Sequence, residues 1–125
     1  DWAIAHNIQH GGWCPKGRLA EDGPIPNVYA LKELDSYQYA DRTRRNIVDS
    51  DATLILYART LEGGSLLTYR HANRLRKPVF KVRLYGSRPT LKVREWLNEV
   101  RPLRLNIAGP RASTQPKIYE LAYDY

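Results

Sequence analysis

The sequence predicts an α/β protein with a Rossmann-like, doubly wound, mainly parallel sheet and helices on both faces. Residues 52–58 form one continuous apolar run, typical of a strand buried on both sides. The segments after it alternate between helical and strand periodicity at spacings that suit βαβ units. Because no linker divides the 125 residues, we expect a single domain over residues 1–125.

The chain opens with the pattern of the second part of a helix. Ile4 and Ile8 lie one helical turn apart, and nothing before Asp1 supplies a cap. The sequence contains no methionine. We therefore expect that the domain is N-terminally incomplete.

An extended segment over residues 10–15 is expected next, followed by a loop over 16–27 that is rich in glycine, proline and charge. Val28–Leu31 is predicted as a short strand. Ser36 is a predicted N-cap for a helix that runs to about Asp49. Three apolar residues of this helix are expected on one side, namely Tyr37, Ala40 and Ile47.

The C-terminal part repeats the strand–helix alternation. After the strand at 52–58, glycines open a helix from Gly63 to about Arg76, and Pro78 follows where the helix cannot continue. Residues 79–82 are the next expected strand. An amphipathic helix is predicted over 91–100, with apolar residues at i, i+3, i+4 and i+7, namely Val93, Trp96, Leu97 and Val100. The last expected elements are a strand over 103–108 and a helix near 116–123.

Composition limits the partners and the compartment. The net charge is +7, from 20 basic and 13 acidic residues, which favours an anionic partner. The basic residues form no run, so nucleic acid is the least favoured partner and solvated helix faces explain many of them. Cys14 is the single cysteine, which fits a reducing, cytoplasmic compartment. The apolar runs fall far short of the ~20 residues that span a bilayer, so no membrane partner is expected.

The first candidate site follows the strongest predicted strand. Gly63, Gly64 and Ser65 open a helix there, and Thr68 lies about one turn further on. Glycines let a phosphate approach the backbone, Ser65 adds a hydroxyl, and the helix dipole favours negative charge. We expect an anion site at this turn; the alternative is an ordinary capping turn that uses glycine for its geometry.

The second candidate is the segment from Gly11 to Arg18. Lys16 and Arg18 could hold an anion, and Trp13 could stack on a heterocycle. Glu21 or Asp22 could bind ribose hydroxyls or a metal ion. An ordered Ω-type loop whose charges pair among themselves is an equally good interpretation. Cys14 fits a small buried residue better than a nucleophile.

The third candidate ends the last predicted strand. Asn106 and Arg111 are polar residues that could reach a ligand, and Gly109-Pro110 fixes the turn between them. A purely structural role for Asn106 and Gly109 is equally compatible with the sequence. The three histidines have no metal-ligand spacing, so we assign no protein-built metal site.

These segments together resemble the molybdenum carrier family, whose members are molybdenum cofactor carrier-like proteins of the lysine-decarboxylase-like Rossmann superfamily. The matching stretches follow one another across nearly the whole chain. They are Gly11–Arg18 with Glu21–Pro26, Arg42-Thr43 with Asn46, Ser50–Ile55, Gly63–Thr68 and Leu105–Arg111. The resemblance implies a Rossmann-like fold that lacks its first strand and its N-terminal glycine-rich loop.

The resemblance also implies a function. Ligands in this superfamily are nucleotides or similar phosphate-bearing compounds, so the leading hypothesis is a carrier module for molybdenum cofactor or a nucleotide, and relatives often form homo-oligomers. A phosphoribohydrolase-like enzyme, with Glu21 or Asp22 as the acid–base group, is the alternative. The phosphoribohydrolase motif ends in a glutamate, whereas the corresponding stretch Glu62–Arg70 ends in an arginine, which argues against the same hydrolysis.

Overall fold

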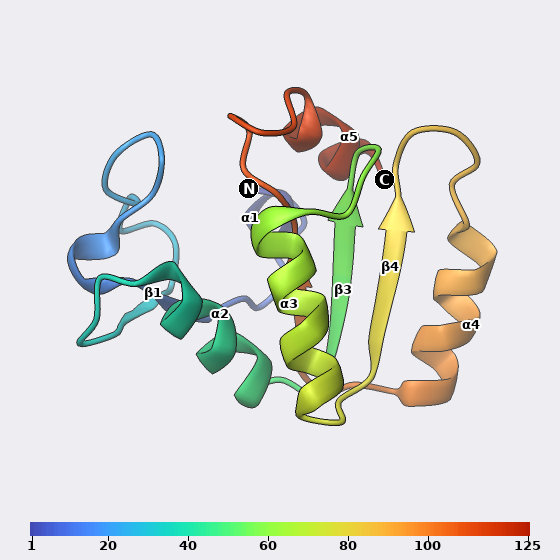
Figure 1. The fold of residues 1–125 in the computed structure, drawn as a ribbon, viewed down its shortest axis with the longest axis horizontal. Coiled ribbons are helices and arrows are strands. Elements are labelled where there is room, and N and C mark those ends of the chain that lie inside the picture. Colours follow the sequence, from blue (N-terminus) through green and yellow to red (C-terminus); the bar gives the residue numbers. More distant parts are fainter. The chain divides into compact units, whose positions relative to one another are not determined.

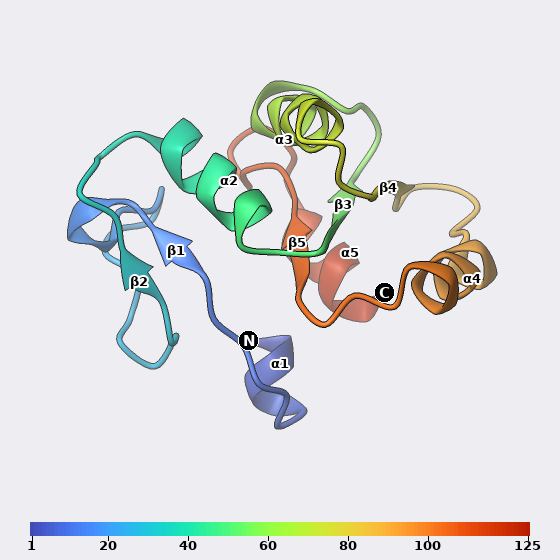
Figure 2. The ribbon, with the colours of Figure 1, turned by 90° about the horizontal axis from the view of Figure 1, so that it is seen from below.

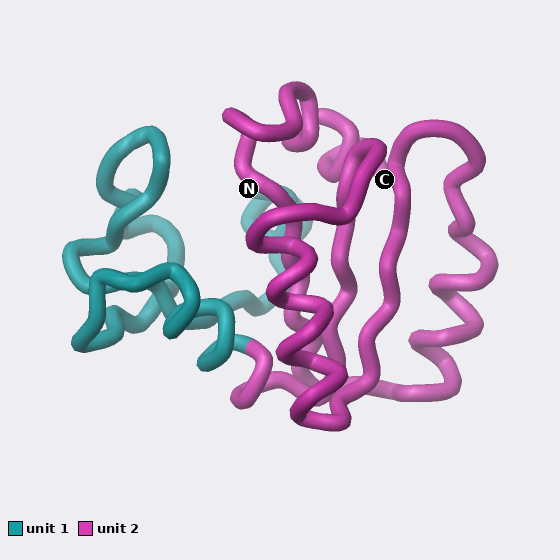
Figure 3. The backbone as a smooth tube through the Cα atoms, in the orientation of Figure 1, with its two compact units in different colours: residues 1–46 teal, residues 47–125 magenta.

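A computed structural model of the chain describes residues 1–125 and divides them into two compact units. Unit 1 is Asp1–Asn46 and unit 2 is Ile47–Tyr125 (Figure 3). Each unit has its own parallel sheet, so the two are described in turn. None of the helices in either unit has the length and apolar character needed to cross a membrane.

Unit 1 is built mostly from loops around a small parallel sheet. Strand β1 (Trp13–Cys14) pairs with β2 (Lys32–Glu33), with Trp13 opposite Lys32. The Asn46 side chain ties this sheet to helix α2, because it accepts a hydrogen bond from the Trp13 N–H at 2.8 Å and donates to the Trp13 carbonyl at 3.2 Å. The other elements are α1 (Trp2–Ala5), the 3-10 turn η1 (Lys16–Arg18) and α2 (Tyr39–Val48).

The predicted strand at Val28–Leu31 is wrong. These residues form turns, Val28 is 63% exposed, and pairing begins only at Lys32. The cause is the Arg18 guanidinium, which donates hydrogen bonds to the carbonyls of residues 25, 26, 29 and 31. Carbonyls that a side chain gathers around one point cannot also line up along a strand edge.

Helix α2 begins later than its sequence signal indicates. The Ser36 hydroxyl accepts a hydrogen bond from the Gln38 N–H at 3.2 Å and pairs with the Asp41 carboxylate at 2.6 Å, so it closes a turn ahead of the helix. Tyr37 and Ala40 are exposed, and only Ile47 of the three predicted apolar residues is buried. The opening helix is also shorter than predicted, since Asn7 adopts a left-handed φ of 53°.

Unit 2 contains the main sheet, three parallel strands in the order β4-β3-β5. Figures 1 and 2 show β3 at the centre, α3 over one face, and α4 and α5 over the other. This arrangement confirms the predicted Rossmann-like α/β class. The elements are β3 (Ala52–Tyr57), α3 (Gly63–Arg74), β4 (Val79–Arg83), α4 (Thr90–Val100), β5 (Leu105–Ala108) and α5 (Ile118–Asp124).

The central strand is buried on both faces, as its apolar run predicts. Leu54 and Leu56 belong to a core cluster that includes Val93 of α4 and Ile118 of α5. Because side chains alternate along a strand, Thr53 and Ile55 point to the opposite face. There they lie under α3, whose buried residues are Ser65, Thr68 and Ala72.

The last strand starts two residues later than expected. Leu103 is 96% exposed, and the Arg104 N–H donates to the carboxylate of Asp51, the residue before β3, at 2.8 Å. Pro102 has no N–H to offer to a ladder. Pairing then runs from Leu105 opposite Ala52 to Ala108 opposite Ile55.

Candidate functional site

The carboxyl ends of the three parallel strands of unit 2 lie at one edge of the sheet, where the loops after β3, β4 and β5 meet (Figure 1). In open parallel sheets this edge is where helix N-termini point their N–H groups at ligands. A cleft of about 440 Å³ opens there. Its lining residues are Ala58, Arg59, Thr60, Glu62, Tyr85, Thr114, Gln115, Pro116 and Lys117.

The α3 N-terminus borders this cleft through Glu62. The N–H groups of Gly63, Gly64 and Ser65 have no hydrogen-bond partner, and the first N–H to find one is that of Leu66, which bonds the Glu62 carbonyl at 3.3 Å. The Glu62 side chain makes no capping bond. Three unpaired N–H groups and the positive end of the helix dipole form a ready anion cradle.

The two glycines of this turn differ. Gly63 has a φ of +54°, in the left-handed region, and this conformation turns the chain into the helix. Gly64 has ordinary helical geometry, and a Cβ built on it meets no atom within 4 Å. The space beside Gly64 is therefore open for a ligand to reach the backbone.

Ser65 and Thr68 both face the sheet. Ser65 is 1% exposed, and its hydroxyl has no hydrogen-bond partner. A buried hydroxyl without a partner carries a desolvation cost of ~1–3 kcal/mol. Thr68 is 4% exposed and its hydroxyl already donates to the Gly64 carbonyl at 2.8 Å, so it supports the turn from within the helix.

Residues Thr114–Lys117 form the other wall of the cleft, whereas the predicted residues Asn106 and Arg111 do not line it. Asn106 donates a hydrogen bond to the Thr53 hydroxyl at 3.3 Å, within the sheet. Gly109 lets β5 approach β3, since a Cβ there would lie 2.9 Å from the Leu56 carbonyl oxygen. The Arg111 carbonyl begins the turn that follows by accepting the N–H groups of Thr114 and Gln115.

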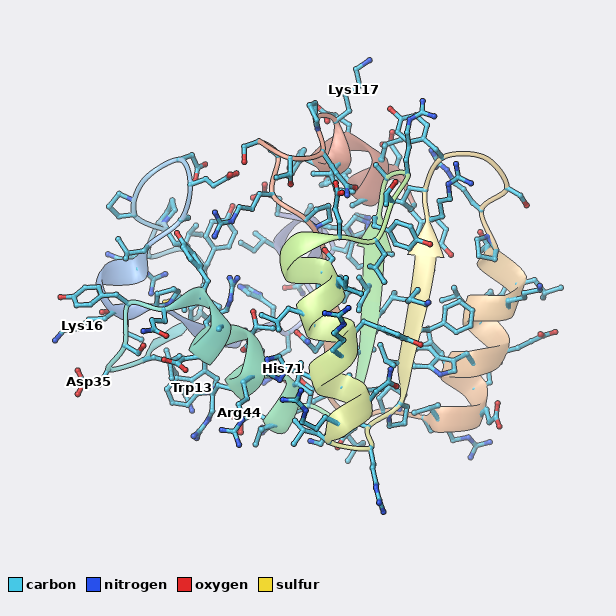
Figure 4. All side chains as sticks on the ribbon, in the orientation of Figure 1. Trp13, Lys16, Asp35, Arg44, His71 and Lys117 are labelled. Carbon is cyan, nitrogen blue, oxygen red and sulfur yellow. The ribbon has the colours of Figure 1, made fainter.

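None of the nine residues that line the cleft was predicted from the sequence as a ligand residue. Arg59 places its guanidinium 4.2 Å from the centre of the Tyr85 ring, a cation–π contact at the cleft wall. Gln115 is buried and bonds the loop after β3. Lys117 extends away from the sheet in Figure 4. Tyr85 could have been found because it lies two residues after the end of β4, whereas no local pattern marks Gln115.

The predicted residues of the second candidate lie in unit 1, where their charged groups contact other residues of the same unit. The Lys16 ammonium is 3.4 Å from the Asp35 carboxylate, and Figure 4 shows the two side by side. Arg18 holds its loop together through four carbonyls. The Trp13 ring has the Arg45 guanidinium 4.7 Å and the Lys32 ammonium 5.5 Å from its centre.

The excess positive charge is confined to unit 2. Unit 1 has six basic and six acidic residues, whereas unit 2 has fourteen basic and seven acidic ones. An anion is therefore attracted to the unit that carries the α3 N-terminus. No group of three or more histidine, cysteine, aspartate or glutamate side chains in the chain is placed to hold a metal ion.

Comparisons with known proteins agree with this fold. One solved structure is that of the "Putative molybdenum carrier protein" from Syntrophus aciditrophicus SB, which is 42% identical to this chain with a TM-score of 0.96. The match covers 99% of this chain and 80% of the other. A comparison with curated proteins found no match. The resemblance to the molybdenum carrier family is confirmed. A family model described as cpYpsA, the circularly permutated YpsA SLOG family, matches residues 1–125, and the chain belongs to that family.

Proposed function

We propose that this chain is a binding or carrier module for a phosphate-bearing small molecule, with molybdenum cofactor and a nucleotide as the two candidate ligands. The observation that carries the proposal is the α3 N-terminus, where three consecutive N–H groups lack partners beside the open space at Gly64. The name of the Syntrophus relative supports the carrier role and the molybdenum-related ligand.

The residues present fit the phosphate of either ligand. Gly63, Gly64 and Ser65 would hold the phosphate oxygens through their N–H groups. Molybdenum cofactor would supply its own redox-active metal. Arg59 is the nearest basic side chain that lines the cleft from this loop, and it adds charge for the rest of the ligand.

Among the residues predicted from the sequence, those of the α3 turn are the strongest ligand candidates. Asn106 and Arg111 belong to the segment on the β5 side, and Thr68 supports the turn through its bond to Gly64. Lys16 and Arg18, which the sequence predicts as charge partners, lie in unit 1 and have acceptors there, so the proposal does not rest on them.

A titration with inorganic pyrophosphate tests the anion site. Gly64→Leu should lower the affinity at least tenfold, because the side chain fills the space through which a phosphate reaches the backbone; a tenfold change is ~1.4 kcal/mol. Ala40→Leu is the matched control, since Ala40 is exposed and is likewise the second residue of a helix. Equal affinities in all three proteins would refute the site.

The ligand itself is identified by releasing what copurifies with the chain. Gently purified protein is denatured, and the released fraction is examined by mass spectrometry with elemental analysis for molybdenum. A pterin accompanied by molybdenum supports the cofactor carrier, and a nucleotide without metal supports the nucleotide alternative. The absence of any phosphate-bearing compound, together with no pyrophosphate binding, would overturn the proposal.

A further inference from the structure

A single buried amide side chain joins the two walls of the cleft in unit 2. Gln115, which is 7% exposed, accepts a hydrogen bond from the Ala58 N–H on its Oε1 at 2.7 Å. Its Nε2 donates to the Thr60 carbonyl at 2.8 Å. Both bonds have ordinary lengths, and together they fix the orientation of the amide, since the N–H of Ala58 can only donate.

These bonds continue the sheet beyond its last paired residue. Pairing of β5 with β3 stops at Ala108 opposite Ile55, and Ala58 lies three residues further along the chain, 4% exposed. Its N–H would have no strand partner there, and an unpaired buried N–H is costly. A glutamine amide carries one donor and one acceptor side, like a peptide group, so it replaces the missing strand residue.

The bonded residues lead directly into the anion cradle. Ala58 and Thr60 flank Arg59, whose guanidinium lies against the Tyr85 ring, and Gly63 follows three residues after Thr60. Two bonds across Arg59 therefore fix both the direction of its side chain and the path by which the chain enters α3.

The same residue is anchored on the other wall. The Gln115 N–H donates to the Arg111 carbonyl at 2.9 Å, and its own carbonyl accepts the N–H of Ile118, the first residue of α5, at 3.2 Å. The turn from Arg111 to Lys117 is thus held at one end by β5, at the other by α5, and in the middle by this buried side chain.

We propose that Gln115 is a positioning residue for the anion site, setting the loop that enters α3 against the Arg111–Lys117 turn. The inference rests on the proposed function, because it assigns a role at the same site. A site whose donors are held in place in advance binds more tightly, since the ligand does not have to order them.

The test compares two substitutions of different charge, using sulfate as the probe because its charge is constant across the pH range used. Gln115→Met keeps the length of the side chain and removes both hydrogen bonds. Its affinity for sulfate should fall on the order of tenfold, the loss typical of removing a residue that orients a binding group. Gln9→Met, at an exposed glutamine of unit 1, is the matched control and should bind as the unchanged chain does.

Gln115→Glu separates positioning from simple destabilisation. A protonated glutamic acid accepts from Ala58 and donates to Thr60 as glutamine does, and burial keeps its carboxyl protonated at about pH 5. Its affinity should match that of the unchanged chain at about pH 5 and fall below it at about pH 8. Affinity is measured by titration calorimetry on protein whose CD spectrum is native, so only the folded population counts. If Gln115 had a purely structural role, the ratio of the Gln115→Glu affinity to that of the unchanged chain would be the same at both pH values.

The outcomes distinguish the two proposals. If the unchanged chain binds neither sulfate nor pyrophosphate, the proposed function fails. If it binds, but folded Gln115→Met retains its affinity within about twofold or Gln115→Glu shows no change of relative affinity with pH, the role of Gln115 is refuted while the anion site stands. Should Gln115→Met fail to fold, the pH dependence of Gln115→Glu alone decides.

Discussion

The two neighbouring glycines at the start of α3 should respond in opposite directions to the same substitution. Gly63 has a φ of +54° and Gly64 lies in the helical region, and a Cβ at either position meets no atom within 4 Å. Packing therefore contributes nothing to the comparison. The lower entropy of the unfolded chain with alanine is common to both, so the difference isolates the backbone conformation.

The magnitudes follow from those conformations. A left-handed conformation costs an L-residue about 1–2 kcal/mol, so Gly63→Ala should destabilise the protein by roughly that amount. Gly64→Ala should stabilise it by about 0.5–1 kcal/mol, because alanine replaces glycine within a helix. The two variants should thus differ by about 2 kcal/mol in the free energy of unfolding.

Urea denaturation followed by tryptophan fluorescence, to which Trp96 in the core of unit 2 contributes, measures both changes. The denaturant slope should stay constant. Gly63→Asn is the control, since asparagine tolerates the left-handed region better than alanine and should lose less stability. Gly64→Ala adds a second readout, because it should stabilise the fold while weakening pyrophosphate binding. A shift of the same sign in both alanine variants would refute the reasoning.

Two further predictions concern contacts that hold unit 2 together. Gly109→Ala places a Cβ 2.9 Å from the Leu56 carbonyl oxygen and should cost about 1–3 kcal/mol of unfolding free energy by urea denaturation; a loss under about 0.5 kcal/mol would contradict the close approach. The Lys77 ammonium donates to the carbonyls of residues 47, 48 and 50 at 3.1, 2.6 and 2.6 Å, at the end of α2. Lys77→Met should cost about 1–2 kcal/mol and speed amide exchange in that turn, whereas Lys92→Met, at an exposed lysine of α4, should leave both unchanged.

Unit 2 was largely predictable because its signals are local. The continuous apolar run of β3, the glycines that open α3 and the i, i+3, i+4, i+7 pattern of α4 each depend on neighbours in sequence. Val93 is buried, and Trp96 and Leu97 pack against the same core, as that pattern predicts. The position of the α3 N-terminus follows from the same signals, since a helix that begins directly after a buried strand must start at the carboxyl edge of the sheet.

Unit 1 shows where such signals fail. Residues 28–31 have strand composition, yet the Arg18 side chain takes the carbonyls that a strand would need. Ser36 has a capping side chain, yet it bonds Gln38 and Asp41 in a turn before the helix. Both outcomes depend on which of several polar groups forms the hydrogen bond, and the sequence alone does not rank these groups.

The sequence by itself determined the fold class, the three strands and three helices of unit 2, and the glycine turn that opens α3. Only the tertiary structure decided that Gln115 forms hydrogen bonds with Ala58 and Thr60, which lie more than fifty residues earlier in the chain. It also decided that Arg18 and Lys16 form their polar contacts within unit 1. The physical reason is the distance along the chain over which each kind of interaction acts. Periodicity and turn chemistry act between neighbours along the chain, whereas a buried hydrogen bond is chosen by which groups folding brings within 3 Å of each other.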